Sequence, residues 1–163
     1  MCTLLYNAVK KLLPVCVCST PNLDAIIQLS KQRALEGGHS YVFPEHLALA
    51  LLQYKSGWAF RTLHASALPV TALQTALESV QNSAKSYDLV KTADAITLDV
   101  STKRILTHVL QSADELVLNH AVIGYVLLAI LKSNTQAAHI LHKFGLTHKV
   151  AKALAYCQLI ERP

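Results

Sequence analysis

The chain has 163 residues, of which 52% are hydrophobic and 15% are charged, and its formal net charge is +5. This length fits one domain with a core of its own, which needs no disulfide or metal staples. The apolar fraction excludes a disordered chain, and the moderate charge is not the clustered charge of a nucleic-acid grip. Only five glycines and five prolines interrupt a sequence dominated by alanine and leucine, so the composition favours helices.

Glycine and proline signals divide the first half of the chain into helices. Apolar residues at helical spacing lead up to Gly37-Gly38, a pair that is typical of a helix end. Pro44 is tolerated at a first helical position, which predicts that a second helix begins there. Pro69 breaks the apolar pattern once more, between a third and a fourth helix. The four predicted helices cover about residues 22–36, 44–54, 58–67 and 71–80.

The second half of the chain begins after a polar, mixed stretch over residues 81–99, which is the best candidate for an internal linker. Ser101 then offers an N-cap, and a helical pattern runs from there to Leu118. A short turn is expected over residues 122–126. The remaining helices are predicted over residues 126–131, 136–141 and 148–156.

These two halves repeat one another. The segment that begins at residue 58 corresponds to the one at residue 136, and Ala67 corresponds to Gly145, an offset of 78 in both cases. A unit of four helices is too small to bury its apolar faces well, so the two units should pack as one pseudo-symmetric all-α domain. We expect an N-terminal extension over 1–20 and a domain over 21–163, with repeat one at about 22–80 and repeat two at about 100–160.

Two polar residues, Glu45 and His46, stand at the start of the helix that begins at Pro44. We expect both to face the turn and water, because the leucines that follow them supply the buried face. An acid at a helix N-terminus gains about 0.3 to 1 kcal/mol from the helix macrodipole, so Glu45 has a structural explanation beside that of a partner contact. His46 could simply complete the turn. Tyr41, if exposed beside Glu45, would be an aromatic anchor for a peptide or an adaptor.

The residues of this corner are similar to a known motif. The stretch Gly38-His39-Ser40-Tyr41-Val42-x-x-Glu45-His46-Leu47-x-Leu49-x-Leu51-Leu52, followed by Gly57-x-Ala59 and Leu63, resembles the Clp repeat. This repeat occurs twice in the N-terminal domain of the AAA+ unfoldases of the ClpA and ClpC type, and the resemblance covers about residues 22–156. It implies an all-helical pseudo-dimer of two four-helix repeats that has no enzymatic activity and docks adaptors and substrates.

The resemblance also implies which residues bind a partner. In ClpC-like domains the glutamate of this motif helps to bind the guanidinium of phosphoarginine-marked substrates, which makes Glu45 a candidate. Glu45 and His46 match the motif, whereas Phe43 and Pro44 stand where the family has glycine and a capping threonine. The second repeat has neither acid nor histidine at the matching positions. We therefore expect a single site for a partner or substrate, with Glu45, His46 and Tyr41.

The sequence predicts neither an enzyme nor a cofactor. None of the five glycines is followed by lysine, so the phosphate-binding loop of a Clp motor is missing, and no nucleophile is marked by its neighbours. The expected function is a non-catalytic docking domain that recruits adaptors or tagged proteins for unfolding and degradation by the Clp system. The alternative is a free-standing accessory subunit that binds the Clp ATPase or the peptidase ring.

The cysteines and the apolar runs indicate the compartment. Three of the four cysteines lie within residues 1–18, which makes no disulfide framework and fits a reducing compartment. Cys16 and Cys18 lack the second pair that a zinc site needs. No apolar run reaches the roughly 18 to 20 residues of a membrane span, so no membrane partner is expected. We expect a cytoplasmic protein, or one of an organelle stroma or matrix if the N-terminal extension is a targeting segment.

One long segment, from Leu116 to Ile160, has basic residues and no Asp or Glu between its ends. It could meet an acidic partner or phosphates, although a solvated face without a partner is the commoner case, and nucleic acid is not the expected partner. His139, His142 and His148 could hold zinc, but no complete zinc motif surrounds them, so no metal is expected. The basic residues of the segment are Lys132, Lys143, Lys149, Lys152, His120, His139, His142 and His148.

Overall fold

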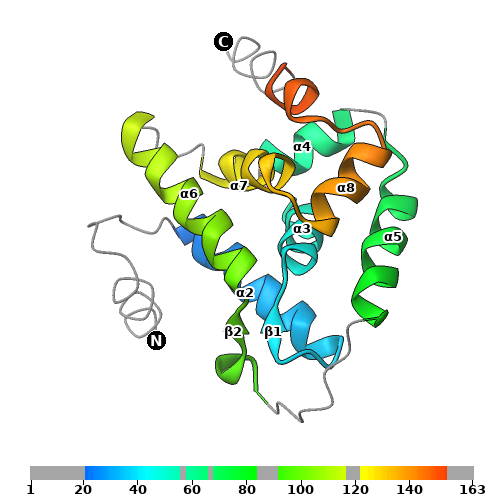
Figure 1. Cartoon of the computed structure of the whole chain (residues 1–163), viewed down its shortest axis with the longest axis vertical. Coiled ribbons are helices and arrows are strands. Elements are labelled where there is room, and N and C mark those ends of the chain that lie inside the picture. Colours follow the sequence, from blue (N-terminus) through cyan, green and yellow to red (C-terminus); the bar gives the residue numbers. More distant parts are fainter. Residues whose placement is uncertain (1–20, 56–57, 66–67, 84–91, 117–121, 154–163) are drawn as a thin grey trace.

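The computed structural model describes residues 21–55, 58–65, 68–83, 92–116 and 122–153. It is almost entirely helical, as the sequence predicts, with two short strands and one 3-10 turn (Figure 1). None of the helices in these ranges is long and apolar enough to cross a membrane. The elements are α2 (Pro21–Glu36), β1 (Tyr41–Val42), α3 (Pro44–Gln53), α4 (Trp58–Ala65), α5 (Val70–Ser83), η1 (Ala93–Ala95), β2 (Thr97–Leu98), α6 (Val100–Leu116), α7 (Val122–Lys132) and α8 (Gln136–Lys143); residues 148–153 are helical as well.

The predicted duplication is confirmed by the order and the lengths of the helices. Helices α2 and α6 have 16 and 17 residues, α3 and α7 have 10 and 11, and α4 and α8 have 8 each. The helical segment 148–153 follows α8 as α5 follows α4. Each half of the chain therefore folds as the same series of helices.

The two repeats contact one another reciprocally. Helices α3 and α7 pack together, the contact of α3 with α8 has its counterpart in α4 with α7, and that of α2 with α7 has its counterpart in α3 with α6. Such an exchange of equivalent contacts is the rule for an interface about a twofold axis. The domain is thus a pseudo-dimer within one chain, with α3 and α7 at its centre.

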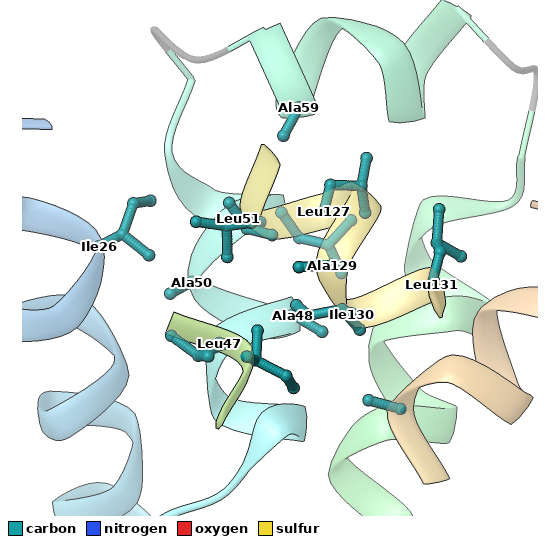
Figure 2. Packing of buried hydrophobic residues seen from close by; sticks show 14 of the residues in the cluster. Ile26, Leu47, Ala48, Ala50, Leu51, Ala59, Leu127, Ala129, Ile130 and Leu131 are labelled. Atoms are coloured by element: carbon teal, nitrogen blue, oxygen red, sulfur yellow. The ribbon is translucent and has the colours of Figure 1, made fainter. Parts of the chain in front are cut away.

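Helix α3 is enclosed by the other helices. Every residue from Pro44 to Leu52 is buried, and a helix that is apolar around most of its circumference needs such surroundings. The alanines between its leucines let neighbouring helices approach closely. Figure 2 shows Leu47 and Leu51 of α3 in the same interior as Leu127 and Ile130 of α7. One core thus serves both repeats.

A short parallel β-ribbon provides a second link between the repeats. Strand β1 pairs with β2 in parallel, with Val42 opposite Leu98. The carbonyl of Val42 accepts hydrogen bonds from the Asp99 N–H at 3.1 Å and from the Thr102 hydroxyl at 2.7 Å. Ile96 is buried with Val42 in a small apolar cluster. The stretch just before α6 is therefore docked on the first repeat.

Several boundaries differ from the sequence prediction, among them the end of α5 and the starts of α6 and α7. Helix α5 continues to Ser83, and α6 begins at Val100 with Asp99 as its cap, because the Asp99 carboxylate accepts from the Ser101 N–H at 2.9 Å. The turn predicted over 122–126 is wrong, since α7 already begins at Val122. Its start is apolar with only one glycine, the buried Gly124, and nothing there ends a helix.

The predicted linker over 81–99 is narrower in the structure. Residues 81–83 belong to α5, and residues 92–99 form η1 and β2 against the first repeat. Residues 84–91 lie outside the described ranges, as does the extension over 1–20. The bounds given for the extension, the two repeats and the linker stay predictions.

The packing of α3 can be tested with Leu51→Ala. Leu51 is fully buried in the shared core, so we expect the variant to lose about 2 to 5 kcal/mol of unfolding free energy, measured by urea denaturation. Val100→Ala is the control, because Val100 has an exposed fraction of 61% and its truncation should change stability by about 0.5 kcal/mol or less. Equal losses in the two variants would contradict the shared core.

Candidate functional site

The turn between α2 and β1 is built on two glycines. Gly38 has a φ of 72°, and the hydrogen bonds from Gly38 N to Leu35 O and from His39 N to Ala34 O form a Schellman motif. A Cβ on Gly37 would lie 2.6 Å from Nδ1 of His39. The glycine pair therefore ends the helix and also leaves room for the imidazole of His39 to turn inward.

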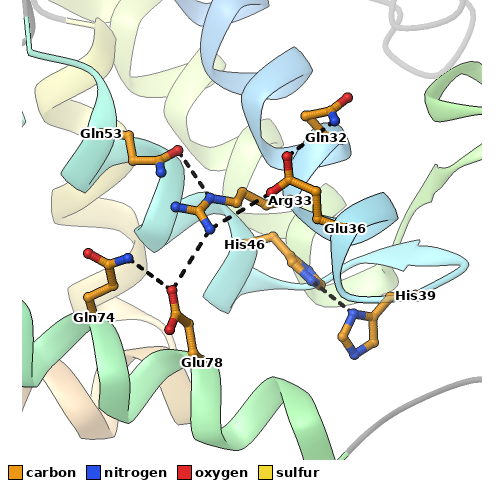
Figure 3. A network of polar contacts seen from close by, with 8 residues as sticks. All are labelled: Gln32, Arg33, Glu36, His39, His46, Gln53, Gln74 and Glu78. Carbon is orange, nitrogen blue, oxygen red and sulfur yellow. Dashed lines mark hydrogen bonds and ion pairs between the residues drawn. The ribbon is translucent and has the colours of Figure 1, made fainter.

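Two histidines form a hydrogen-bonded chain behind this turn. The Phe43 N–H donates to Nδ1 of His46 at 2.9 Å, so the neutral His46 ring carries its hydrogen on Nε2. Nε2 of His46 lies 3.4 Å from Nδ1 of His39, and the two side chains are joined in Figure 3. Nε2 of His39 in turn donates to the carbonyl of Gln81 at 2.9 Å. The chain links the start of α3 to the ends of α2 and α5.

His46 completes the start of α3 from inside the protein. The helix begins after Phe43, whose side chain cannot accept a hydrogen bond, and His46 at the third helical position supplies the acceptor. The rings of Phe43 and His46 are stacked with centroids 5.8 Å apart. Burial lowers the pKa of His46 to about 3, and the neighbouring His39 adds to this effect. A proton on Nδ1 would also oppose the Phe43 N–H, so the fold requires a neutral ring.

Glu45 joins the two repeats. Its Oε1 accepts a hydrogen bond from the N–H of Ala137 at 3.0 Å, across 92 residues of sequence. This N–H lies in the first turn of α8, where the Thr135 side chain accepts from the next residue, Ala138. A carboxylate from the first repeat thus caps a helix of the second.

The carboxyl of Glu45 is buried near a second acid. Burial raises its pKa, hydrogen bonds from its own backbone and from Ala137 oppose this, and the charge of Asp99 raises the pKa further. Asp99 in turn caps α6. Two of the helix starts at this corner are therefore neutralised by carboxylates of the chain itself.

A cleft of about 300 Å³ opens at this corner. The starts of α3, α6 and α8 and the last turns of α5 meet around it. Among the residues that the structure describes, its wall contains the carboxylate residues Glu45 and Asp99 and no lysine, arginine or histidine. An uncharged rim of amides and hydroxyls surrounds them. The lining residues are Phe43, Pro44, Glu45, Val80, Gln81, Asp99, Ser101, Asn134, Thr135 and Gln136.

The predicted site residues occupy different environments. Tyr41 is exposed by 49% on β1 and does not line the cleft. The expectation that Glu45 and His46 face water is wrong, since their exposed fractions are 8% and 0%. The start of α8 covers Glu45, and His39 and Phe43 enclose His46. Whether Glu45, His46 and Tyr41 bind a partner stays a prediction.

Some features of the corner have no clear sequence signal. Asp99 precedes an apolar pattern and could have been found as an N-cap, but the position of Gln81 and Gln136 beside it follows from the packing alone. The histidines 139, 142 and 148, offered as zinc ligands, do not come together. In the described ranges no three His, Cys, Asp or Glu side chains are placed to hold a metal.

A network of ionic and hydrogen-bonded side chains connects α2, α3 and α5 on their outer side. Nε of Arg33 on α2 donates to the Gln53 side chain at 3.1 Å, and its Nη1 lies 3.8 Å from the carboxylate of Glu78 on α5 (Figure 3). Glu36 is 3.9 Å from the same nitrogen. Partly exposed pairs of this kind contribute little to stability, about 0 to 1 kcal/mol each. The buried histidine chain is therefore the stronger connection between the ends of α2 and α5.

A comparison with protein-family models identifies the family of this chain. The family model described as the Clp repeat N-terminal domain matches residues 19–144. The chain belongs to this Clp family. In this Clp domain Glu45 accepts from the start of α8 across the interface of the repeats, and His46 holds the start of α3 within the first repeat.

Solved structures share the fold of this Clp domain. One is the N-terminal domain of the caseinolytic protease-associated chaperone ClpD from Arabidopsis thaliana, with 17% identity and a TM-score of 0.67 over 86% of this chain and 93% of that chain. Another comes from preliminary structural investigations of a malarial protein secretion system, with 14% identity and a TM-score of 0.72 over 85% and 92%. Curated protein sequences give no match. At these identities the likeness concerns the fold.

The buried His46 predicts a loss of stability in acid. Between pH 6.5 and about 3 the unfolded chain binds a proton on His46 that the folded chain does not bind. Stability is therefore complete above pH 6.5 and falls as the pH falls, by about 1.4 kcal/mol per pH unit from this group. His46→Asn removes the titration and keeps an acceptor for Phe43. Urea unfolding at several pH values should show a flatter profile for this variant, whereas the exposed His139→Asn should keep the steep one. An equally steep profile in His46→Asn would contradict the prediction.

The bond from Ala137 to Glu45 predicts an order of stabilities. Glu45→Gln keeps an acceptor oxygen and removes the repulsion from Asp99, so we expect a small change in the free energy of unfolding. Glu45→Ala leaves the Ala137 N–H without its acceptor and should cost about 1 to 3 kcal/mol. Thermal and urea denaturation measure both. If the two variants are equally stable, the carboxylate is not the cap of α8.

Proposed function

We propose that this Clp domain is a non-catalytic docking module, which recruits adaptors or tagged substrates to the Clp chaperone–protease system. Membership in the Clp family supports a role within that system. The observation that carries the docking proposal is the cleft between the two repeats, because it is formed around the motif residue Glu45. Concave sites lined by residues from several elements are the usual places of binding.

The charges of the cleft favour a cationic group. Glu45 and Asp99 lie close enough for the charge of Asp99 to raise the pKa of Glu45, and none of the wall residues in the described ranges is basic. A guanidinium or an ammonium would relieve this repulsion, and a guanidinium also has the donors to satisfy carboxylate oxygens and side-chain amides. The partner therefore presents an arginine or a lysine side chain.

A phosphate fits this cleft less well than a cation. Helix starts usually attract phosphates through their free N–H groups. Here the carboxylates of Glu45 and Asp99 already accept from the first turns of α8 and α6. An incoming phosphate would meet both negative charges. We therefore expect an unmodified arginine to bind more tightly than phosphoarginine, the ligand that the ClpC resemblance implies.

The other two predicted residues have different parts in this proposal. Tyr41 is half exposed at the ribbon that leads into the corner, and it can contact the body of a partner outside the cleft. His46 has no exposed surface and acts indirectly by holding the start of α3, on which Glu45 lies. Contact with the partner is thus assigned to Glu45 and Tyr41.

The test is a titration of the ¹⁵N-labelled chain with an arginine-containing peptide, with phosphoarginine and with purified candidate Clp adaptors. We expect amide shifts around Glu45, Asp99 and Gln136, with the peptide binding more tightly than phosphoarginine. Glu45→Gln and Asp99→Asn should each weaken the peptide by about tenfold, which corresponds to 1.4 kcal/mol. Asparagine still caps a helix, so Asp99→Asn should stay folded.

Glu78→Gln is the matched control, because it removes an exposed carboxylate on α5 that does not line the cleft. It should bind like the unchanged chain. Shifts that avoid the corner, or an equal loss in all three variants, would overturn the docking proposal. Co-purification with the Clp peptidase ring in the absence of any motor, without adaptor binding, would instead assign the chain to the accessory subunits.

A further inference from the structure

The net positive charge of the protein is concentrated in the second repeat. Residues 117–160 hold four lysines and no Asp or Glu, so they account for four of the five net positive charges. The fold gathers part of this charge. His148 and Lys152 are one helical turn apart. The pKa of His148 is lowered mainly by burial, and the charges of Lys132 and Lys152 lower it further. Lys132 at the end of α7 therefore lies near the segment 148–153.

Three of these lysines are exposed and make no ion pair within the described ranges, namely Lys132, Lys149 and Lys152. Arg33 on the first repeat, in contrast, pairs with two carboxylates, those of Glu36 and Glu78. Uncompensated like charges repel one another, which costs stability that a partner with the opposite charge would return.

An apolar residue lies within the same surface. Val150 is exposed by 41%, which makes it one of three large apolar side chains so exposed in the described ranges. At 100° per residue, Lys149 lies between Val150 and Lys152 around the helix. An approaching chain that meets Lys149 can therefore reach an apolar side chain on one flank and an ammonium on the other.

The segment that carries this surface is firmly held. Its first turn is capped by Thr147, whose hydroxyl accepts from the Val150 N–H at 3.3 Å. Leu146 before it and Ala151 within it are fully buried in the common core. The basic side chains thus project from a fixed backbone, which lowers the entropy lost on binding.

We propose that this surface, defined by Lys132, His148, Lys149, Val150 and Lys152 and called here the basic face, docks an acidic segment of a partner protein that carries an apolar side chain among its carboxylates. The charges match carboxylates, and Val150 matches the apolar side chain. Residues 122–153 contain no arginine, the residue that reads bases and binds phosphates most often, and neither Tyr125 nor Phe144 among them is exposed for base stacking. The basic face shares no residue with the cleft, and the proposal does not rest on that site's function.

The experiment measures fluorescence anisotropy of labelled probes titrated with the full chain at low salt. The probes are a short oligoglutamate peptide, the same peptide with one central leucine, and a duplex DNA of equal charge. We expect the leucine peptide to bind most tightly, about threefold or more above oligoglutamate, and its affinity to fall as salt is raised. Lys149→Glu with Lys152→Glu should weaken it by at least about tenfold. Val150→Ser should abolish only the gain from leucine.

The matched control reverses two exposed lysines on other elements, Lys55→Glu and Lys103→Glu, with the same change of net charge. It should change the affinity for the leucine peptide by less than about twofold. Equal losses in the two charge-reversal variants would show a general charge effect and overturn the proposal. Tighter binding of DNA than of both peptides, or no advantage of leucine, would overturn the choice of an acidic protein segment. Circular dichroism verifies that each variant is folded.

Discussion

The enclosure of α3 is the constraint on which the other features depend. Because every residue from Pro44 to Leu52 is buried, the polar groups of the first turn of α3 are largely withdrawn from water and need partners within the protein. His46 supplies the acceptor for the Phe43 N–H, and Glu45 uses its carboxylate to cap α8. Glu45 thus links the two repeats, and His46 fixes the start of α3 within the first repeat. Any partner that engages Glu45 must work with a carboxylate that already has a structural duty.

The two repeats differ most clearly at the start of α3 and at the equivalent start of α7. Where the first repeat has Glu45, the leucine-alanine register places Gly124 in the second, and this glycine is buried inside α7. The apolar contacts are reciprocal between the repeats, whereas in the described residues no carboxylate of the second repeat mirrors the bond from Ala137 to Glu45. The pseudo-symmetric domain thus has an acidic cleft between its repeats, and most of its net positive charge lies in residues 117–160. The apolar packing is thus pseudo-symmetric, whereas the polar contacts are not.

Local signals predicted the helices, and long-range geometry decided the site. The start of α3 at Pro44 and the end of α2 at the glycine pair depend on neighbouring residues alone, and both are confirmed. The duplication was visible because equivalent apolar runs recur at a fixed offset. The partner of Glu45 could not be predicted, because it is a backbone N–H, which every residue except proline has, 92 positions away. The burial of His46 was missed for a similar reason, since its neighbour His39 is turned inward after α2 and held there by the carbonyl of Gln81 on α5.

The shared core has a consequence for synthesis of the chain. Helix α3 leaves the ribosome well before α7 and α8, the helices that complete its enclosure and accept the Glu45 cap. Until they emerge, the nascent first repeat displays a strongly apolar helix whose buried acid has no native partner, and such surfaces are prone to misassembly. Folding of the greater part of the domain therefore has to wait until α7 and α8 have emerged, and until then the apolar surface of α3 stays exposed on the growing chain.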